Sequence, residues 1–125
     1  MIRRISTLVL LAVMAVSLSA SAHEMSKHAA STVVGEVVDT GCYLGHAAHG
    51  ASHASCAARC IEGGMPMGLL TSQGAMYLLT MNHDNPDPYN KLKAMAGRNV
   101  AVTGAVLTRG GVKGIDVASI KLMAK

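Results

Sequence analysis

The sequence predicts a mainly β domain of five short strands, and three observations support this fold class. Runs that are rich in β-branched residues, or that alternate apolar and polar side chains, recur over residues 32–40, 63–81 and 99–123. Turn-forming residues separate these runs. One helix-like stretch, 89–97, lies between the third and the fourth strand. This order is typical of an OB-like barrel, whose closure leaves no exposed sheet edge. An open β-sandwich fragment with the same strands is the alternative.

The turns between the strands have clear sequence signals. Gly35 inside the first strand suggests a bulge or bend. The run 63–81 is expected to form two strands joined by a tight turn at Ser72-Gln73-Gly74. The run 99–123 alternates on both sides of Arg109-Gly110-Gly111, which is the pattern of a β-hairpin.

The helix between the third and the fourth strand is short. Leu92 and Met95 lie at helical spacing, and Gly97 closes the stretch, so we expect a helix over 89–97. The preceding segment 82–88 is dense in Asn, Asp and Pro and is expected to be a loop.

The first 22 residues have the features of a cleavable signal peptide. A basic start, Met-Ile-Arg-Arg, precedes an apolar run, and Ala20-Ser21-Ala22 supplies a small-residue cleavage site. The apolar run is short for a membrane span, so we expect an exported, periplasmic or secreted protein without stable membrane insertion after cleavage. The expected organisation is a signal peptide, a flexible arm and a single OB-like domain, over residues 1–22, 23–31 and 32–125 respectively.

The composition argues against a nucleic-acid partner. The formal net charge of the whole chain is +4, and removal of the leader takes away Arg3 and Arg4. The chain has no Trp and no Phe and only three Tyr, whereas bases need aromatic faces for stacking. A small domain with so little aromatic mass often gains stability from a metal or a disulfide.

The segment 46–60 carries the most distinctive chemistry. Successive His and Cys residues are separated by 3, 4, 3 and 4 positions, which places their side chains on one face of a helix. Gly45 and Gly50 favour a loop in the first part, so we expect the helix to start near Ser52, with Ser52 or Ser55 as its cap. The residues with this spacing are His46, His49, His53, Cys56 and Cys60.

A third cysteine, Cys42, stands just after the first strand and can turn back toward this helix. Together with His53, Cys56 and Cys60 it completes a Cys3His set, a composition typical of a closed tetrahedral zinc site. Thiolates also suit Cu(I), so the predicted cofactor is one ion of zinc or copper.

Two other interpretations of the three cysteines remain open. A bridge between Cys56 and Cys60 has poor geometry within a regular helix, but Cys42 can pair with either of them and leave one free thiol. Alternatively, all three are structural thiols that behave as small hydrophobic residues.

Further residues are candidates for secondary metal binding. His46 and His49 either form a second, exchangeable site or are solvated loop residues. Met65 and Met67 can serve as thioether ligands of Cu(I), although both also suit the core of a chain without Phe and Trp. If cleavage follows Ala22, His23 carries a free α-amine beside its imidazole, a pair that chelates Cu(II).

The chain resembles small exported bacterial proteins with an OB-like barrel, over residues 33–120. The resemblance implies a Cys/His insertion between the first and the second strand, and it brings no established reaction with it. It assigns Asp39 and Tyr43 supporting roles, as a hydrogen-bond acceptor and a packing lid. The motifs that carry it are Asp39-x-x-Cys42-Tyr43, His53-x-x-Cys56-x-x-x-Cys60, Gly64-x-Pro66-x-Gly68 and the closing hairpin.

The sequence therefore predicts a periplasmic metal-binding protein, in which the ion is either structural or in transit. A thiol-redox protein is an alternative, although the chain has no C-x-x-C motif. A ligand-binding OB module without a cofactor is another. An enzyme is not expected, because a catalytic zinc needs a nearby general base and Glu62 is the only carboxylate close to the cluster on its C-terminal side.

Overall fold

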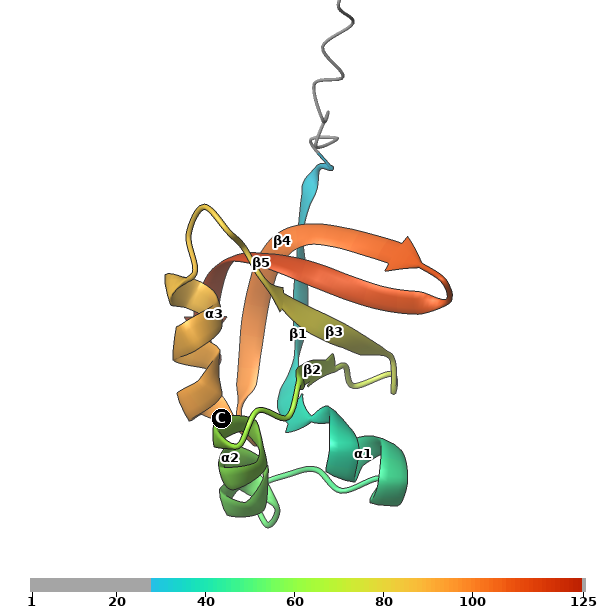
Figure 1. The fold of residues 1–125 in the computed structure, drawn as a ribbon, viewed down its shortest axis with the longest axis vertical. Coiled ribbons are helices and arrows are strands. Elements are labelled where there is room, and N and C mark those ends of the chain that lie inside the picture. The colour runs from blue at the N-terminus through green and yellow to red at the C-terminus, as the bar shows by residue number, and fades with distance from the viewer. Residues whose placement is uncertain (1–27, 125) are drawn as a thin grey trace, which may run out of the picture.

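The computed structural model describes residues 28–124, so the expected signal peptide and His23 lie outside the described residues. Five strands, three α-helices and one 3-10 turn follow one another along this part of the chain (Figure 1). In chain order they are β1 (Ala30–Asp39), α1 (Thr40–His46), α2 (Ala54–Glu62), β2 (Met67–Leu70), β3 (Met76–Met81), α3 (Asp87–Leu92), η1 (Lys93–Met95), β4 (Asn99–Arg109) and β5 (Val112–Leu122).

The five strands form a closed barrel in the order β1-β2-β3-β5-β4. The barrel closes because β1 pairs antiparallel with β2 at one end of its length and with β4 along the rest. Strand β3 pairs parallel with β5, and all other pairs are antiparallel. The mainly β, OB-like barrel predicted from the sequence is confirmed, with the helical insertion between β1 and β2 and the short helix between β3 and β4. The open alternative is wrong.

Strand β1 starts at Ala30, so the last two residues of the expected flexible arm belong to the barrel. Gly35 does not form a bulge, since the pairing with β4 runs through it without interruption. A Cβ at this position would lie 2.5 Å from the backbone oxygen of Leu70, so glycine permits the close approach of β2. The register shift lies instead in β4, between Thr103 and Gly104.

The hairpin and the helix between β3 and β4 agree closely with expectation. Gly110 and Gly111 join β4 to β5 with φ values of 57° and 80°, as a two-residue turn requires. The α3 helix starts at Asp87, two residues earlier than expected, because Pro88 in its first turn is compatible with a helix start.

The barrel interior is filled by aliphatic side chains from the strands and from two helices. The fully buried side chains include Val37, Leu69, Val100 and Ile115 from the strands. Leu92 of α3, with Ala57 and Ile61 of α2, packs against them. Helix α2 is therefore fixed to the barrel by one face, which leaves a neighbouring face for its cysteines.

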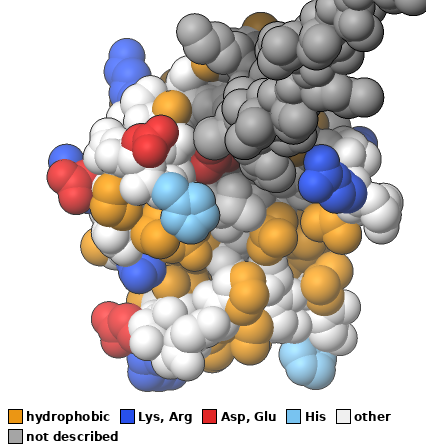
Figure 2. Space-filling model, turned by 45° about the horizontal axis from the view of Figure 1, so that its top comes forward, with side chains coloured by type: hydrophobic (Ala, Val, Ile, Leu, Met, Phe, Trp, Pro, Cys, Tyr) orange, Lys and Arg blue, Asp and Glu red, His pale blue; other side chains and the backbone are white. Residues whose placement is uncertain are grey.

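The surface is mixed in character. On the face shown in Figure 2, charged side chains are scattered among hydrophobic and uncharged ones and do not gather in one basic patch. Within residues 28–124, no helix is long and apolar enough to cross a bilayer.

Candidate metal centre

The site begins where β1 ends. Asp39, the last residue of β1, is the N-cap of α1, and its Oδ1 accepts a hydrogen bond of 2.7 Å from the backbone N–H of Cys42. Aspartate is among the best N-cap residues because it accepts from an N–H that has no partner inside the helix. The spacing Asp-x-x-Cys thus has a local cause, since the cap acts on the third residue of the helix and places Cys42 beside the carboxylate.

A second contact fixes the start of α1 against the segment before β2. The backbone N–H and the hydroxyl of Thr40 each donate to the backbone oxygen of Pro66, at 3.0 Å. Helix α1 therefore has a defined position next to the barrel end, although the sequence did not predict it. Two glycines and a β-branched residue make its seven residues poor helix formers.

Helix α2 and the residue before it carry the other predicted ligands. It starts at Ala54, with His53 in the N-cap position, so the expectation that Ser52 or Ser55 caps it is wrong. The His53 side chain makes no capping hydrogen bond, and its imidazole is therefore free to turn toward α1. Cys56 and Cys60 lie one turn apart in the same helix.

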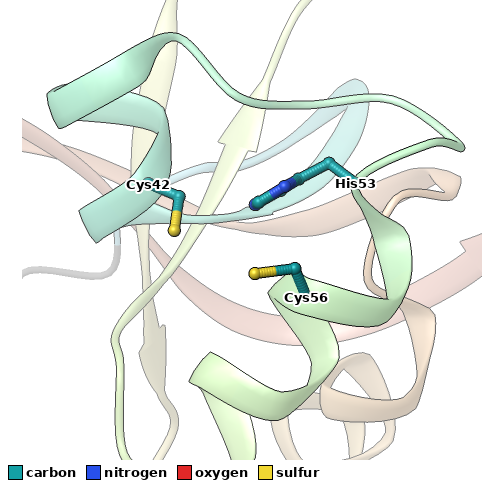
Figure 3. Close-up of side chains that lie close together, drawn as sticks. All are labelled: Cys42, His53 and Cys56. Carbon is teal, nitrogen blue, oxygen red and sulfur yellow. The ribbon is translucent and has the colours of Figure 1, made fainter.

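The side chains of Cys42, His53 and Cys56 point toward one another from the two helices (Figure 3). One potential ligand atom from each lies within 4.8 Å of those of the other two. A second group with the same spacing consists of Asp39, Cys42 and Cys60. The four residues predicted as ligands thus meet in one cluster, as two overlapping groups that share Cys42. Asp39 is the member that the ligand prediction did not include.

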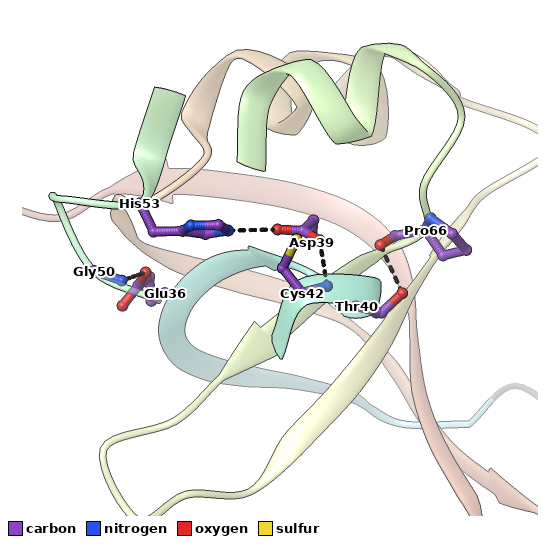
Figure 4. A network of polar contacts seen from close by, with 7 residues as sticks. All are labelled: Glu36, Asp39, Thr40, Cys42, Gly50, His53 and Pro66. Carbon is purple, nitrogen blue, oxygen red and sulfur yellow. Dashed lines mark hydrogen bonds and ion pairs between the residues drawn. The ribbon is translucent and has the colours of Figure 1, made fainter. Parts of the chain in front are cut away.

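Asp39 is the most buried polar residue of the cluster, with no exposed surface. Its Oδ2 lies 3.1 Å from Nε2 of His53, so the carboxylate accepts from the imidazole on one oxygen and from the backbone of Cys42 on the other (Figure 4). A carboxylate in this position fixes the ring orientation of a metal-binding histidine. The acceptor role that the resemblance assigned to Asp39 agrees with this geometry.

The cluster shifts the pKa values of two of its members. Burial raises the pKa of Asp39, but hydrogen bonds from the backbone and thiol of Cys42 and from His53 outweigh it, so the pKa lies below the usual value. The hydrogen bond to Asp39, followed by burial and the Asp39 charge, raises the pKa of the Cys42 thiol to about 12. The metal-free site therefore holds a neutral Cys42 thiol beside an ionised carboxylate.

The loop between the helices is held by Glu36 of β1. One oxygen of Glu36 accepts from the backbone N–H of Gly50, and the other lies 3.4 Å from Nδ1 of His49. The ring of Tyr43 contacts His49 edge-on, with ring centroids 6.3 Å apart. Tyr43 thus packs on this loop, and His49 takes part in positioning the chain that leads to His53.

The secondary candidates have different environments. His46 is exposed at the last residue of α1 and, like His49, belongs to neither of the two potential ligand groups among the described residues. Met67 is a core residue with 1 % exposure, which agrees with its alternative interpretation as a core side chain. Met65 is partly exposed and lies against Gly41, where a Cβ would be 2.8 Å from its sulfur.

Comparisons with protein-family models, with curated proteins and with solved structures found no match to this chain.

Proposed function

We propose that this chain is an exported metal-binding protein that holds one zinc or copper ion between α1 and α2. The observation that carries the proposal is the convergence of Cys42, His53 and Cys56, whose potential ligand atoms all lie within 4.8 Å of one another. Thiolate and imidazole are the donors that zinc and Cu(I) prefer.

Cys60 supplies the fourth donor. Its sulfur lies within 4.8 Å of that of Cys42. Ligand atoms around a tetrahedral zinc lie about 3.8 Å apart, given a Zn–S distance of about 2.3 Å. Cys56 and Cys60 share neither group, so binding of all four donors to one ion requires α1 and α2 to approach and the Cys56 and Cys60 side chains to turn toward each other. We assign Asp39 the role of orienting His53, because its Oδ2 lies 3.1 Å from Nε2 of His53 while its Oδ1 caps α1.

The exposure of the site favours an ion that can exchange. All three cysteines are partly exposed, and the His53 side chain is 20 % exposed. The barrel, in contrast, has a fully buried core of its own. We therefore propose metal handling as the role of the site, with ordering of the α1–α2 segment as its structural consequence.

The deciding experiment is to purify the exported protein from the periplasm and to measure its intact mass, bound metal and free thiols. We expect a chain that begins at His23, one zinc or copper ion per chain and three unoxidised thiols. Purified, correctly folded protein that takes up neither ion when reduced would contradict the proposal. Detection of the protein only in the cytoplasm would contradict the export part alone.

A serine variant at each cysteine distinguishes the cysteines that bind the ion from those that do not. Cys42→Ser should abolish tight binding, because Cys42 belongs to both ligand groups. Ser55→Ala is the matched control, since it changes an exposed α2 residue beside Cys56 that offers neither a sulfur nor an imidazole. Equal affinities of Cys42→Ser and the unmodified chain would rule out this site.

A further inference from the structure

Cys42 has a position that neither of the other cysteines shares. Its sulfur lies within 4.8 Å of the sulfur of Cys56 in one group and of the sulfur of Cys60 in the other. Cys56 and Cys60 occur together in neither group, although they lie in the same helix. Cys42 is therefore the one cysteine whose sulfur lies close to the sulfur of each of the other two.

The arrangement also allows access and approach. All three thiols are partly exposed, so a small oxidant can reach them. A disulfide needs a sulfur–sulfur distance of about 2.05 Å, which requires the sulfurs to approach by at most about 3 Å. Cys42 lies in α1 and its partners lie in α2, and these short helices are joined by a surface loop. Rotation of side chains and a small shift of α1 can supply this approach.

We propose that the metal site is redox-gated, so that it holds its ion only while Cys42 is reduced, and that oxidation of Cys42 to a disulfide with Cys56 or Cys60 releases the ion. This inference rests on the proposed metal-binding function. It names the regulation of that site.

The oxidant is a low-molecular-weight disulfide, and the reaction is a thiol–disulfide exchange in two steps. One protein thiolate attacks the oxidant, forms a mixed disulfide and expels one small thiolate. The second protein thiolate then attacks the protein sulfur of that mixed disulfide and expels the second small thiolate. Two electrons pass from the two protein sulfurs to the oxidant, and the two small thiolates each take up one proton.

Release of the ion follows from the number of donors that remain. A disulfide with either partner converts two thiolates into neutral sulfurs that are poor ligands. His53 and one cysteine are then left, whereas a zinc site uses four donors or three with water. The third cysteine stays as a free thiol, which gives the oxidised state a distinctive thiol count.

The test uses the reduced, exported full chain loaded with Zn²⁺, an ion that does not itself change oxidation state. Oxidised glutathione is added in steps, while a chromophoric chelator reports released zinc and intact mass spectrometry reports thiols. We expect one zinc ion released for each disulfide formed, a fall from three thiols to one, and a peptide map that links Cys42 to α2.

Three serine variants identify the shared sulfur. Cys56→Ser and Cys60→Ser should each still form a disulfide, because Cys42 keeps one partner. Cys42→Ser should form none. Circular dichroism spectra that match the unmodified chain verify that the variants fold, as expected for changes outside the barrel core.

Several outcomes would overturn the inference. These are zinc that stays bound after the disulfide has formed, a bridge between Cys56 and Cys60, and glutathione adducts without any internal disulfide. Failure of the proposed function is distinguishable, because a reduced protein that binds no zinc is detected before the oxidant is added.

Discussion

Asp39 connects the barrel, the helix α1 and the imidazole of His53 through one side chain. It ends β1, caps α1 at Cys42 and lies 3.1 Å from His53, all without exposed surface. A buried carboxylate in such a position needs all of its hydrogen bonds. Its charge and its hydrogen bonds can be separated by substitution, since asparagine is also a good N-cap residue.

The variant Asp39→Asn should keep α1 folded and weaken metal binding. The amide still caps the helix, but it removes the negative charge that orients and polarises His53, an effect that typically costs about 10- to 100-fold in affinity. Competition with a chelator measures this change. Glu36→Gln is the matched control, because Glu36 holds the loop and lies outside both ligand groups. Equal affinity losses in the two variants would argue against a specific role of Asp39.

A second residue-scale prediction concerns the stability of the metal-free protein at high pH. The pKa of Cys42 is about 12 in the folded chain, compared with 9.0 for an ordinary thiol. The folded state thus holds this proton more tightly than the unfolded state does. The protonated Cys42 thiol therefore contributes to folding stability in full below pH 9, and this contribution is lost as the pH rises toward 12.

Urea unfolding of the metal-free, reduced protein between pH 8 and about 10.5 checks this prediction. The unmodified chain should lose stability more steeply than Cys42→Ser, which has no thiol to ionise at this position. Cys56→Ser is the control, since it removes a thiol but keeps Cys42 beside Asp39. Parallel curves for the unmodified chain and Cys42→Ser would contradict the proposed environment of Cys42.

At the scale of the elements, the start of α2 is fixed by a close backbone contact. Gly97, which follows η1, has a φ of 73°, and a Cβ there would lie 2.5 Å from the Cβ of Ala54. His53 directly precedes Ala54. The position of its side chain therefore depends on Gly97, which is more than forty positions away in the sequence.

The variant Gly97→Ala should lower both stability and metal affinity. A left-handed backbone costs a non-glycine residue about 1–3 kcal/mol, and the clash with Ala54 displaces the start of α2. Gly74→Ala is a matched control, because Gly74 has a φ of 80° but open space around its Cβ position. It should lose stability without losing metal affinity. Equal affinities in both variants would show that this contact does not position the site.

The elements also show which parts of the structure a sequence can predict. The β4–β5 hairpin was predictable because its glycine pair and its alternation act locally. Helix α1 was not, since its stability comes from Asp39 and from the contacts of Thr40 with Pro66, 26 positions away. The four candidate ligands were predictable because His53, Cys56 and Cys60 share a helical spacing and Cys42 is the one other cysteine of the chain. The contact between Asp39 and His53 requires the folded chain.

At the scale of the whole molecule, the barrel core and the candidate metal centre are built from different residues. The core consists of aliphatic side chains from all five strands, α2 and the segment around α3, and it contains none of the three cysteines. The cluster lies at one end of the barrel, where α1 and α2 lie next to each other (Figure 1). An ion at this place can hold the two helices together, but the barrel does not need it to bury its core.

Removal of the ion should therefore loosen residues 40–62 and leave the barrel folded. Hydrogen exchange with and without a chelator measures this difference, because local opening and global unfolding expose different amides. We expect faster exchange in α1, in the loop and in the first turn of α2 of the metal-free protein. The amides of β4 and β5 should stay protected in both states, since these strands pair with each other along almost their whole length. Loss of protection throughout the barrel would instead make the ion a requirement for folding, as in small domains whose metal supplies the folding free energy.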